Sequence, residues 1–317
     1  MRTNKPSFRN IKPNGSESRF VTYFFLDQDN TTNLYYAGKT KLYKTNDAEN
    51  VTSSTWVDLG AFNNNEEISR ISATRGTYSS SSSYILIGSR NGSILRLDDP
   101  KNATTLSSAK NITPTGFPTS GTSVVTGLAI HPTNPSIVLA TYSNYGIENI
   151  FLTTNATANT PTWTQVERNL NVHSIRSALI GEVGGQTTYF VGTARGLYSS
   201  TDPTTKDWSL EGGDQIGLPI ISDLAYRPSD NKILIGTHGN GMFETVLKTL
   251  STDSFSSSSL SFSVYPNPTS DELNIKSSSI NFDEATFNIM DLNGKVVSKG
   301  SLENKKLDVK KLTPGVY

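Results

Sequence analysis

The chain has no cysteine, only three histidines, and no excess of charge of either sign. Without cysteine it has neither disulfides nor thiolate metal ligands, so an ordinary side-chain core must hold the fold together. At 317 residues such a core is feasible, because a body of about 300 residues removes roughly three quarters of its unfolded surface from water. The 28 basic residues balance the 28 acidic ones and form no basic tract, so we expect neither nucleic acid nor an anionic membrane as a partner.

Long apolar runs are also missing. No stretch reaches the length of about eighteen apolar residues that suggests a membrane span, so we expect no transmembrane segment. Residues 1–6 lack the apolar part of a signal peptide, and no window has a convincing 3.6-residue apolar period. The many Ser, Thr, Asn and Gly residues favour strands joined by turns and polar loops instead.

A four-part pattern recurs five times between residues 20 and 247. Each copy has an apolar β-rich run that ends in a small residue, then a polar turn and a second apolar run. The small residues are Gly38, Gly88, Ala140, Gly192 and Gly236, in steps of 50, 52, 52 and 44 residues. A recurrence of about 40 to 50 residues fits one four-stranded blade of a β-propeller. The alternative is a β-sandwich with regular hairpins, although a sandwich does not require the same unit at a steady period.

Each copy is preceded by a further β-rich segment, as a four-stranded blade requires. These segments are 20–26, 68–73, 124–130, 175–180 and 220–226. We expect the glycines of the pattern to relieve crowding between strands and to supply a positive φ. The fifth copy is expected to end after its third strand near Val246, so that a closing strand would come from upstream.

Two copies carry an additional motif after the second apolar run. Residues 192–202 (Gly-Thr-Ala-Arg-Gly-Leu-Tyr-Ser-Ser-Thr-Asp) are followed by Trp208, and residues 42–47 (Leu-Tyr-Lys-Thr-Asn-Asp) are followed by Trp56. This order resembles the Asp-box repeat of bacterial neuraminidases, sortilin-type propellers and xyloglucanases.

The resemblance implies a structural role for the Asp-box residues. Asp47 and Asp202 would each hold a turn by bonding backbone donors, and neither would be catalytic. Both copies depart from the family pattern at the next position, where Ala48 and Pro203 replace a glycine.

Three ordered motifs lie in residues 263–317, after a Ser-rich stretch. Residues 265–268 (Tyr265, Pro266, Asn267 and Pro268) open the segment, Gly294 precedes a lysine in a hairpin turn, and residues 312–317, with Gly315, are expected to form a closing strand. This order resembles the type A C-terminal sorting domain of type IX secretion cargo. The resemblance implies export to the bacterial surface or medium, with the type IX machinery as partner. A generic small β-sandwich adhesion module is the alternative.

We therefore predict an all-β chain, a multi-bladed β-propeller followed by a small C-terminal β-sandwich sorting domain. The predicted boundaries are 1–247 for an N-terminally incomplete propeller, 248–262 for a flexible linker and 263–317 for a truncated sorting domain. The family's sorting domain continues beyond Gly-Val-Tyr, and export requires a leader, so we expect the chain to be a fragment.

The loops between second and third strands and the connections between blades leave a propeller on one face, usually the ligand face. The residues that we predict on this face are Lys39, Glu66, Glu67, Arg90, Tyr145, Arg168, Arg195, Glu211, Asp214 and His238. Such a rim could carry a sugar or peptide site. The alternative is that most of these side chains are simply solvated.

The leading functional hypothesis is a non-catalytic propeller that binds an extracellular glycan or protein. The rival is a glycoside hydrolase of the xyloglucanase or sialidase type, with catalytic carboxylates on this face or in upstream blades. It needs two carboxylates either about 5 Å or about 6.5 to 9.5 Å apart, and the candidates are Glu66, Glu67, Glu167, Glu211 and Asp214. A sialidase would also need three arginines, for which Arg90, Arg168 and Arg195 are the candidates, but its Arg-Ile-Pro element is absent.

A third hypothesis makes the propeller a spacer for an upstream protease or adhesin domain. No cofactor is expected. No metal site is expected either, because the three histidines share no ligand spacing and residues 27–30 fit an acidic turn better than a cation loop.

Overall fold

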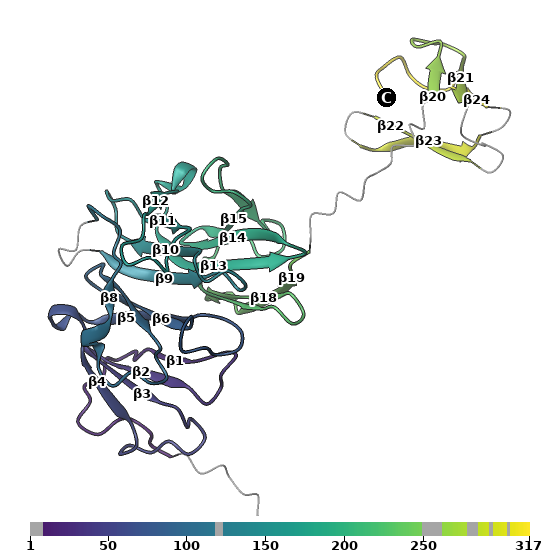
Figure 1. Cartoon of the computed structure of the whole chain (residues 1–317). Helices are drawn as coiled ribbons and strands as arrows, with labels where there is room; N and C mark the ends of the chain where they lie inside the picture. Colours follow the sequence, from purple (N-terminus) through teal and green to yellow (C-terminus); the bar gives the residue numbers. More distant parts are fainter. Residues whose placement is uncertain (1–8, 118–122, 249–261, 278–284, 292–293, 303–304) are drawn as a thin grey trace, which may run out of the picture. The chain divides into compact units, whose positions relative to one another are not determined.

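A computed structural model describes residues 9–117, 123–248, 262–277, 285–291, 294–302 and 305–317 (Figure 1). The chain divides into two compact units, Met1–Thr249 and Leu250–Tyr317. The predicted linker, 248–262, lies almost wholly outside the described residues. Within them the helices are three single 3₁₀ turns, η1 (Asn63–Asn65), η2 (Leu106–Ser108) and η3 (Arg168–Leu170), and no helix there is long and apolar enough to cross a membrane.

The first unit contains five antiparallel sheets whose strands pair in chain order. The first sheet comprises β1 (Phe24–Leu26), β2 (Leu34–Gly38), β3 (Lys41–Thr45) and β4 (Val57–Ala61), and the second comprises β5 (Ile68–Ala73), β6 (Tyr84–Ser89), β7 (Ile94–Asp98) and β8 (Lys110–Asn111). The third comprises β9 (Val124–Ile130), β10 (Val138–Ser143), β11 (Ile150–Thr153) and β12 (Thr164–Gln165). The fourth comprises β13 (Ile175–Val183), β14 (Gln186–Thr193), β15 (Gly196–Ser200) and β16 (Ser209–Glu211), and the fifth β17 (Ile220–Arg227), β18 (Lys232–His238) and β19 (Met242–Val246).

The first strands of all five sheets surround one channel. Residues of β1, β5, β9, β13 and β17 line a shared cavity of about 260 Å³, and each sheet runs outward from there. Sheets arranged in this way are the blades of a β-propeller, so the predicted fold class is confirmed. The predicted upstream segments are these first strands, although β1 begins only at Phe24, and the fifth blade ends after three strands at Val246.

Apolar clusters join successive blades. One buried cluster lies between each of the pairs first and second, second and third, third and fourth, and fourth and fifth. Because both faces of an inner blade are covered, β6 is buried at all six positions. Nowhere in the described part does such a cluster join the fifth blade to the first, and Met242 and Phe24 are 73 % and 66 % exposed there. We call this uncovered boundary the seam.

One polar contact reaches across the channel to both blades of the seam. Arg75, which follows β5, makes two bonds to the carboxylate of Asp29 in the first blade (Nε to Oδ2 2.7 Å, Nη2 to Oδ1 3.1 Å). The same guanidinium donates to the backbone oxygen of Tyr226 in the fifth blade (3.2 Å). The end blades are therefore linked through the second blade by hydrogen bonds rather than by an apolar core.

Three glycines of the repeat, Gly38, Gly88 and Gly192, relieve crowding, whereas Gly236 does not. None of the four has a positive φ, so that half of the expectation was wrong. A Cβ on Gly88 would come within 2.5 Å of Val125 of the next blade. In the third blade the position equivalent to Gly88 is Thr141 rather than Ala140, because Gly127 of β9 pairs with Thr141. There the small residue is Gly127 itself, whose added Cβ would lie 2.6 Å from the backbone nitrogen of Ala178.

We expect Gly192→Ala to lower the free energy of unfolding by about 1–3 kcal/mol, since it overpacks a blade boundary. The new Cβ would lie 2.7 Å from Cγ2 and 2.8 Å from the backbone oxygen of Ile221. Gly236→Ala is the matched control, because its Cβ would meet nothing nearer than 3.5 Å. Urea denaturation of the full chain compares the two variants, and equal midpoints would show that the boundary can accommodate a methyl group.

The second unit is a small sandwich of two sheets. One sheet contains β20 (Phe262–Tyr265), β21 (Glu272–Ser277) and β24 (Lys306–Asp308), and the other contains β22 (Thr286–Met290) and β23 (Val296–Ser301). Side chains from both sheets, including Ile275, Phe287 and Leu307, share one apolar core.

Two of the three C-terminal motifs form turns as predicted. The Tyr265–Pro266 and Asn267–Pro268 peptide bonds are cis, in the turn between β20 and β21. Gly294 has a φ of 77° in the hairpin between β22 and β23.

The predicted closing strand was wrong. Residues 312–317 contain no strand; instead the hydroxyl of Tyr317 donates to the backbone oxygen of Thr313 (2.6 Å), with Gly315 beside the ring. Pro314 explains the difference in part, because it lacks the N–H that a strand ladder requires.

Candidate functional site

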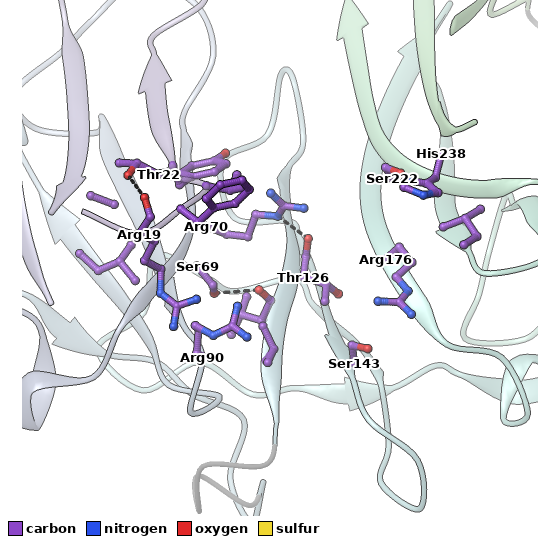
Figure 2. A pocket seen from close by; sticks show the side chains of 18 residues that line it. Arg19, Thr22, Ser69, Arg70, Arg90, Thr126, Ser143, Arg176, Ser222 and His238 are labelled. Atoms are coloured by element: carbon purple, nitrogen blue, oxygen red, sulfur yellow. Dashed lines mark hydrogen bonds between the residues drawn. The ribbon is translucent and has the colours of Figure 1, made fainter. Parts of the chain in front are cut away.

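A polar pocket lies at one mouth of the channel. Its volume is about 750 Å³, and residues from all five blades line it (Figure 2). Its charged side chains are Arg19, Arg70, Arg90 and Arg176, and His238 also lines it. Its hydroxyl side chains are Thr22, Ser69, Thr126, Ser143 and Ser222, besides the phenol of Tyr23. The lining contains no carboxylate.

A repeated β-bulge supplies one lining residue from each of four blades. The pairing of first and second strands skips one residue near the start of β5, β9, β13 and β17. The skipped residues are Ser69, Thr126, Arg176 and Ser222, and all four line the pocket. Because a bulge re-aims side chains relative to the regular pleat, the same backbone irregularity directs a polar group to the channel mouth four times.

Arg19 and Arg90 lie together on one side of the pocket (Figure 2). Arg19 donates to Oε2 of Glu67, and Nε of Arg90 lies 3.8 Å from the same oxygen. The backbone N–H of Arg90 also donates to the backbone oxygen of Glu67 (2.8 Å). Two like charges therefore share the single carboxylate of Glu67. Burial, and then the charge of Arg90, lower the pKa of Arg19.

Arg70 is held inside the pocket by residues of the two adjacent blades. Its Nε donates to the backbone oxygen of Thr126 (2.5 Å), and its guanidinium lies 5.4 Å from the centre of the Tyr23 ring. Arg176, by contrast, is exposed and makes no hydrogen bond or ion pair with any described residue. It lies across the opening from Arg19, on the side of Ser222 and His238 (Figure 2).

Three of the ten predicted ligand-face residues belong to this site. Arg90 and His238 line the pocket, and Glu67 binds Arg19 from beside it. Sequence reasoning missed Arg19, Arg70 and Arg176 because it looked for ligand contacts only in loops and connections. Arg70 and Arg176 lie within first strands, where a polar residue is expected to be solvated or paired.

The other predicted glutamates bind residues of their own blades. Glu66 accepts hydrogen bonds from the hydroxyls of Ser89 (2.5 Å) and Ser93 (3.0 Å), at the two ends of the β6–β7 loop. Glu211 accepts a hydrogen bond from the hydroxyl of Ser199 (2.5 Å).

Glu167, a candidate for a catalytic pair, is only 2 % exposed. Its carboxylate accepts hydrogen bonds from the backbone N–H (2.8 Å) and the side-chain amide (3.1 Å) of Asn149. Burial raises the pKa of Glu167 despite these bonds. The carboxylate thus closes the β10–β11 loop from inside and does not face a ligand.

The remaining predicted ligand-face residues lie outside the pocket. Lys39 pairs with Glu17 (3.1 Å). Arg168 pairs with Asp207 (2.9 Å) and donates to the backbone oxygen of Thr204 (3.2 Å). Three further residues are exposed and outside the pocket lining: Tyr145, Arg195 and Asp214.

The Asp-box positions make local hydrogen bonds. The carboxylate of Asp202 accepts from the backbone N–H of Thr204 (3.1 Å) and from the hydroxyl of Thr205 (2.6 Å). Asp47 accepts from the backbone N–H (3.3 Å) and side-chain amide (3.0 Å) of Asn50. Each carboxylate closes the turn that follows the third strand of its blade, β15 or β3. Membership of the Asp-box family stays a prediction.

The three tryptophans bind the segment that precedes their own blade. Each indole N–H donates to a backbone oxygen there: Trp56 to Ile11 (2.7 Å), Trp163 to Ile112 (2.8 Å) and Trp208 to Val166 (2.8 Å). Trp208 is 3 % exposed, so it also belongs to the core between the third and fourth blades.

In the acidic turn at residues 27–30, backbone N–H groups of the turn itself bind the Asp27 carboxylate. The Oδ1 atom of Asp27 accepts hydrogen bonds from the N–H groups of Asp29 and Asn30 (both 3.0 Å). Across the described ranges, no three His, Asp or Glu side chains come together as metal ligands.

Comparison with known proteins gives the fold of the first unit and the family of the second. The chain is similar to the β-propeller domain of Cps50 (Swd1) of Myceliophteria thermophila, with a TM-score of 0.53 and 13 % identity over 93 % of this chain and 89 % of that one. It is also similar to an ancestral GH74 enzyme, with a TM-score of 0.48 and 14 % identity over 93 % of this chain but only 40 % of the enzyme. At such identities the Cps50 likeness shows the propeller fold alone. No curated protein matches the chain by sequence.

The C-terminal unit has a more specific match. Residues 263–317 match the family of secretion system C-terminal sorting domains. This confirms the predicted sorting domain, so the protein is secreted or attached to the bacterial cell surface through type IX secretion. The machinery of that pathway is its partner.

Proposed function

We propose that this secreted propeller binds an extracellular glycan or protein at the channel mouth and does not hydrolyse it. The observation that carries the proposal is the pocket itself. Five blades contribute to it, four of them through equivalent bulges, and its volume of about 750 Å³ lies within the range of roughly 300–1,000 Å³ of ligand pockets.

Its lining favours binding over glycoside hydrolysis. A glycosidase places two carboxylates at the scissile bond, whereas the pocket lining has none. Of the carboxylates predicted for a hydrolase, Glu66, Glu167 and Glu211 accept hydrogen bonds from their own loops or strands. Glu67 is engaged with Arg19.

A steric block tests the proposal for any kind of ligand. Ser222→Trp places a large side chain in the pocket, and we expect it to weaken binding by about tenfold or more, roughly 1.4 kcal/mol. Ser209→Trp is the control, because Ser209 is exposed on β16, outside the pocket. The full-length protein and both variants would be assayed against plant and host polysaccharides and matrix proteins. Turnover of a polysaccharide, or equal binding by the two variants, would contradict the proposal.

A further inference from the structure

The arginines of the pocket have hydrogen-bonding capacity that the protein does not use. Arg176 has no partner within the described structure. The Arg90 side chain has only the 3.8 Å approach to Glu67. Nε of Arg19 is buried without a hydrogen bond. A guanidinium carries five N–H donors in a fixed planar arrangement that matches an oxyanion, so the site is short of acceptors.

The charge of the pocket is also unbalanced. Four arginines line it. The one carboxylate bonded to any of them in the described structure is that of Glu67, which already accepts a hydrogen bond from Arg19. Like charges held close together repel; burial first, and then the charge of Arg90, lower the pKa of Arg19. An anion in the pocket would relieve the repulsion.

The neighbours of Arg176 are hydrogen-bonding groups. Ser222 and His238 come from the paired strands β17 and β18, where Ile220 lies opposite His238, and Figure 2 shows both on the Arg176 side. Neither side chain has a hydrogen-bond partner among the described residues. Phe20, at the rim, is fully exposed and offers a flat apolar surface.

We propose that the pocket recognises an acidic glycan, with Arg176 binding a carboxylate or sulfate group and Ser222 and His238 binding adjacent sugar hydroxyls. The proposal rests on the proposed function and adds the class of ligand. Arg90 and Arg19 then bind a second acidic group across the opening.

An acidic sugar fits these side chains better than an acidic peptide. A uronate or sulfated sugar holds its acid and its hydroxyls on one rigid ring, so little conformational freedom is lost when several blades contact it together. A peptide rich in Asp and Glu presents each acid on a flexible side chain and offers no hydroxyls for Ser222. The exposed ring of Phe20 can pack against the C–H face of a sugar.

Paired polysaccharides test the class of ligand. The full-length protein would be titrated calorimetrically with polygalacturonate and its methyl ester, and with dextran sulfate and unsubstituted dextran. Titration with poly-glutamate tests whether an acidic peptide binds instead. We expect the acidic member of at least one pair to bind about tenfold or more tightly than its neutral partner, and added salt to reduce that difference. The pair whose two members differ in affinity shows whether the bound acid is a carboxylate or a sulfate.

Substitutions at Arg176 locate the acid. We expect Arg176→Gln to weaken binding of the acidic polysaccharide by about 10- to 100-fold, and Arg176→Lys to restore part of the loss. Because Arg176 is exposed, neither change should alter thermal unfolding. Arg195→Gln is the control, since Arg195 is an exposed arginine outside the pocket, and it should bind like the wild type.

Three outcomes would overturn the inference. If neutral and acidic polysaccharides bind equally while Ser222→Trp still blocks binding, the pocket is a glycan site but not an acidic one, and the proposed function survives. If poly-glutamate binds and no polysaccharide does, the ligand is a protein. Loss of binding in Arg195→Gln equal to that in Arg176→Gln would show general surface attraction instead.

Discussion

Removal of residues 263–317 should abolish the appearance of the protein outside the cell. This segment matches the secretion system C-terminal sorting domain and folds as a unit separate from the propeller, with its own apolar core. The deletion therefore removes the sorting signal that the type IX machinery recognises and leaves the propeller core in place. Immunoblots of cell and medium fractions from a type IX-competent host, with the protein behind a functional leader, measure the effect.

The control for this deletion is Arg176→Gln in the intact chain. It changes one exposed pocket residue in the first unit and should reach the medium at the wild-type level. Undiminished export of the deletion variant would show that the segment is dispensable for sorting.

Arg96→Leu should destabilise the propeller by about 3–5 kcal/mol, because it leaves buried polar groups without a partner. The Arg96 side chain is 3 % exposed and binds Asp98 within the second blade (Nε to Oδ1 2.8 Å). Its Nη1 donates to the backbone oxygens of Ala156 and Ala158 (2.8 Å to the latter) in the third blade. Leucine replaces the packing of the side chain but none of these bonds.

Guanidinium denaturation of the full chain measures this loss, with Arg227→Leu as the control. Arg227 forms an exposed pair with Asp230, and exposed pairs contribute little to stability. A similar shift of the midpoint in both variants would mean that the buried bonds of Arg96 are not specially important.

The ion pair between Arg96 and Asp98 also predicts how the free energy of unfolding depends on pH. Burial acts to raise the pKa of Asp98, but hydrogen bonds from Arg96 and Lys110 outweigh it and lower that pKa below its ordinary 3.8. Since the unfolded chain then binds more protons, the contribution of Asp98 is present above its unfolded pKa and is lost as the pH falls through the folded value. We expect Arg96→Leu to reduce this acid-induced loss.

The repeat was predictable because each inner blade buries both faces. Runs such as Tyr84–Ser89 are buried at every position, so they appear in sequence as short apolar stretches at a steady spacing. The register of the third blade was not predictable to the residue. There the small residue moved to Gly127 in the first strand, and only the pairing of Gly127 with Thr141 reveals the exchange.

The site was only partly predictable, because a bulge changes where a strand residue points. The first strands have two polar or small residues between apolar ones, as in Ile68-Ser69-Arg70-Ile71 and Ile221-Ser222-Asp223-Leu224. That interruption of the two-residue alternation is a signal for a bulge. The engagement of Glu66 with Ser89 and Ser93 has no comparable signal, since it depends on how two loops meet in space.

Among the described residues, the uncovered seam leaves the first and fifth blades with one apolar interface each, as at the two ends of a row. In such an array each unit is stabilised by its neighbours, so a terminal unit has one supporting interface and an internal unit has two. Arg19 belongs to the first blade and His238 to the fifth, yet both line the same pocket. A ligand that contacts both residues joins the two ends of the row, and its binding free energy then adds to the stability of the closed arrangement. If the pocket binds its ligand as proposed, occupancy of the pocket and integrity of the ring are one coupled equilibrium.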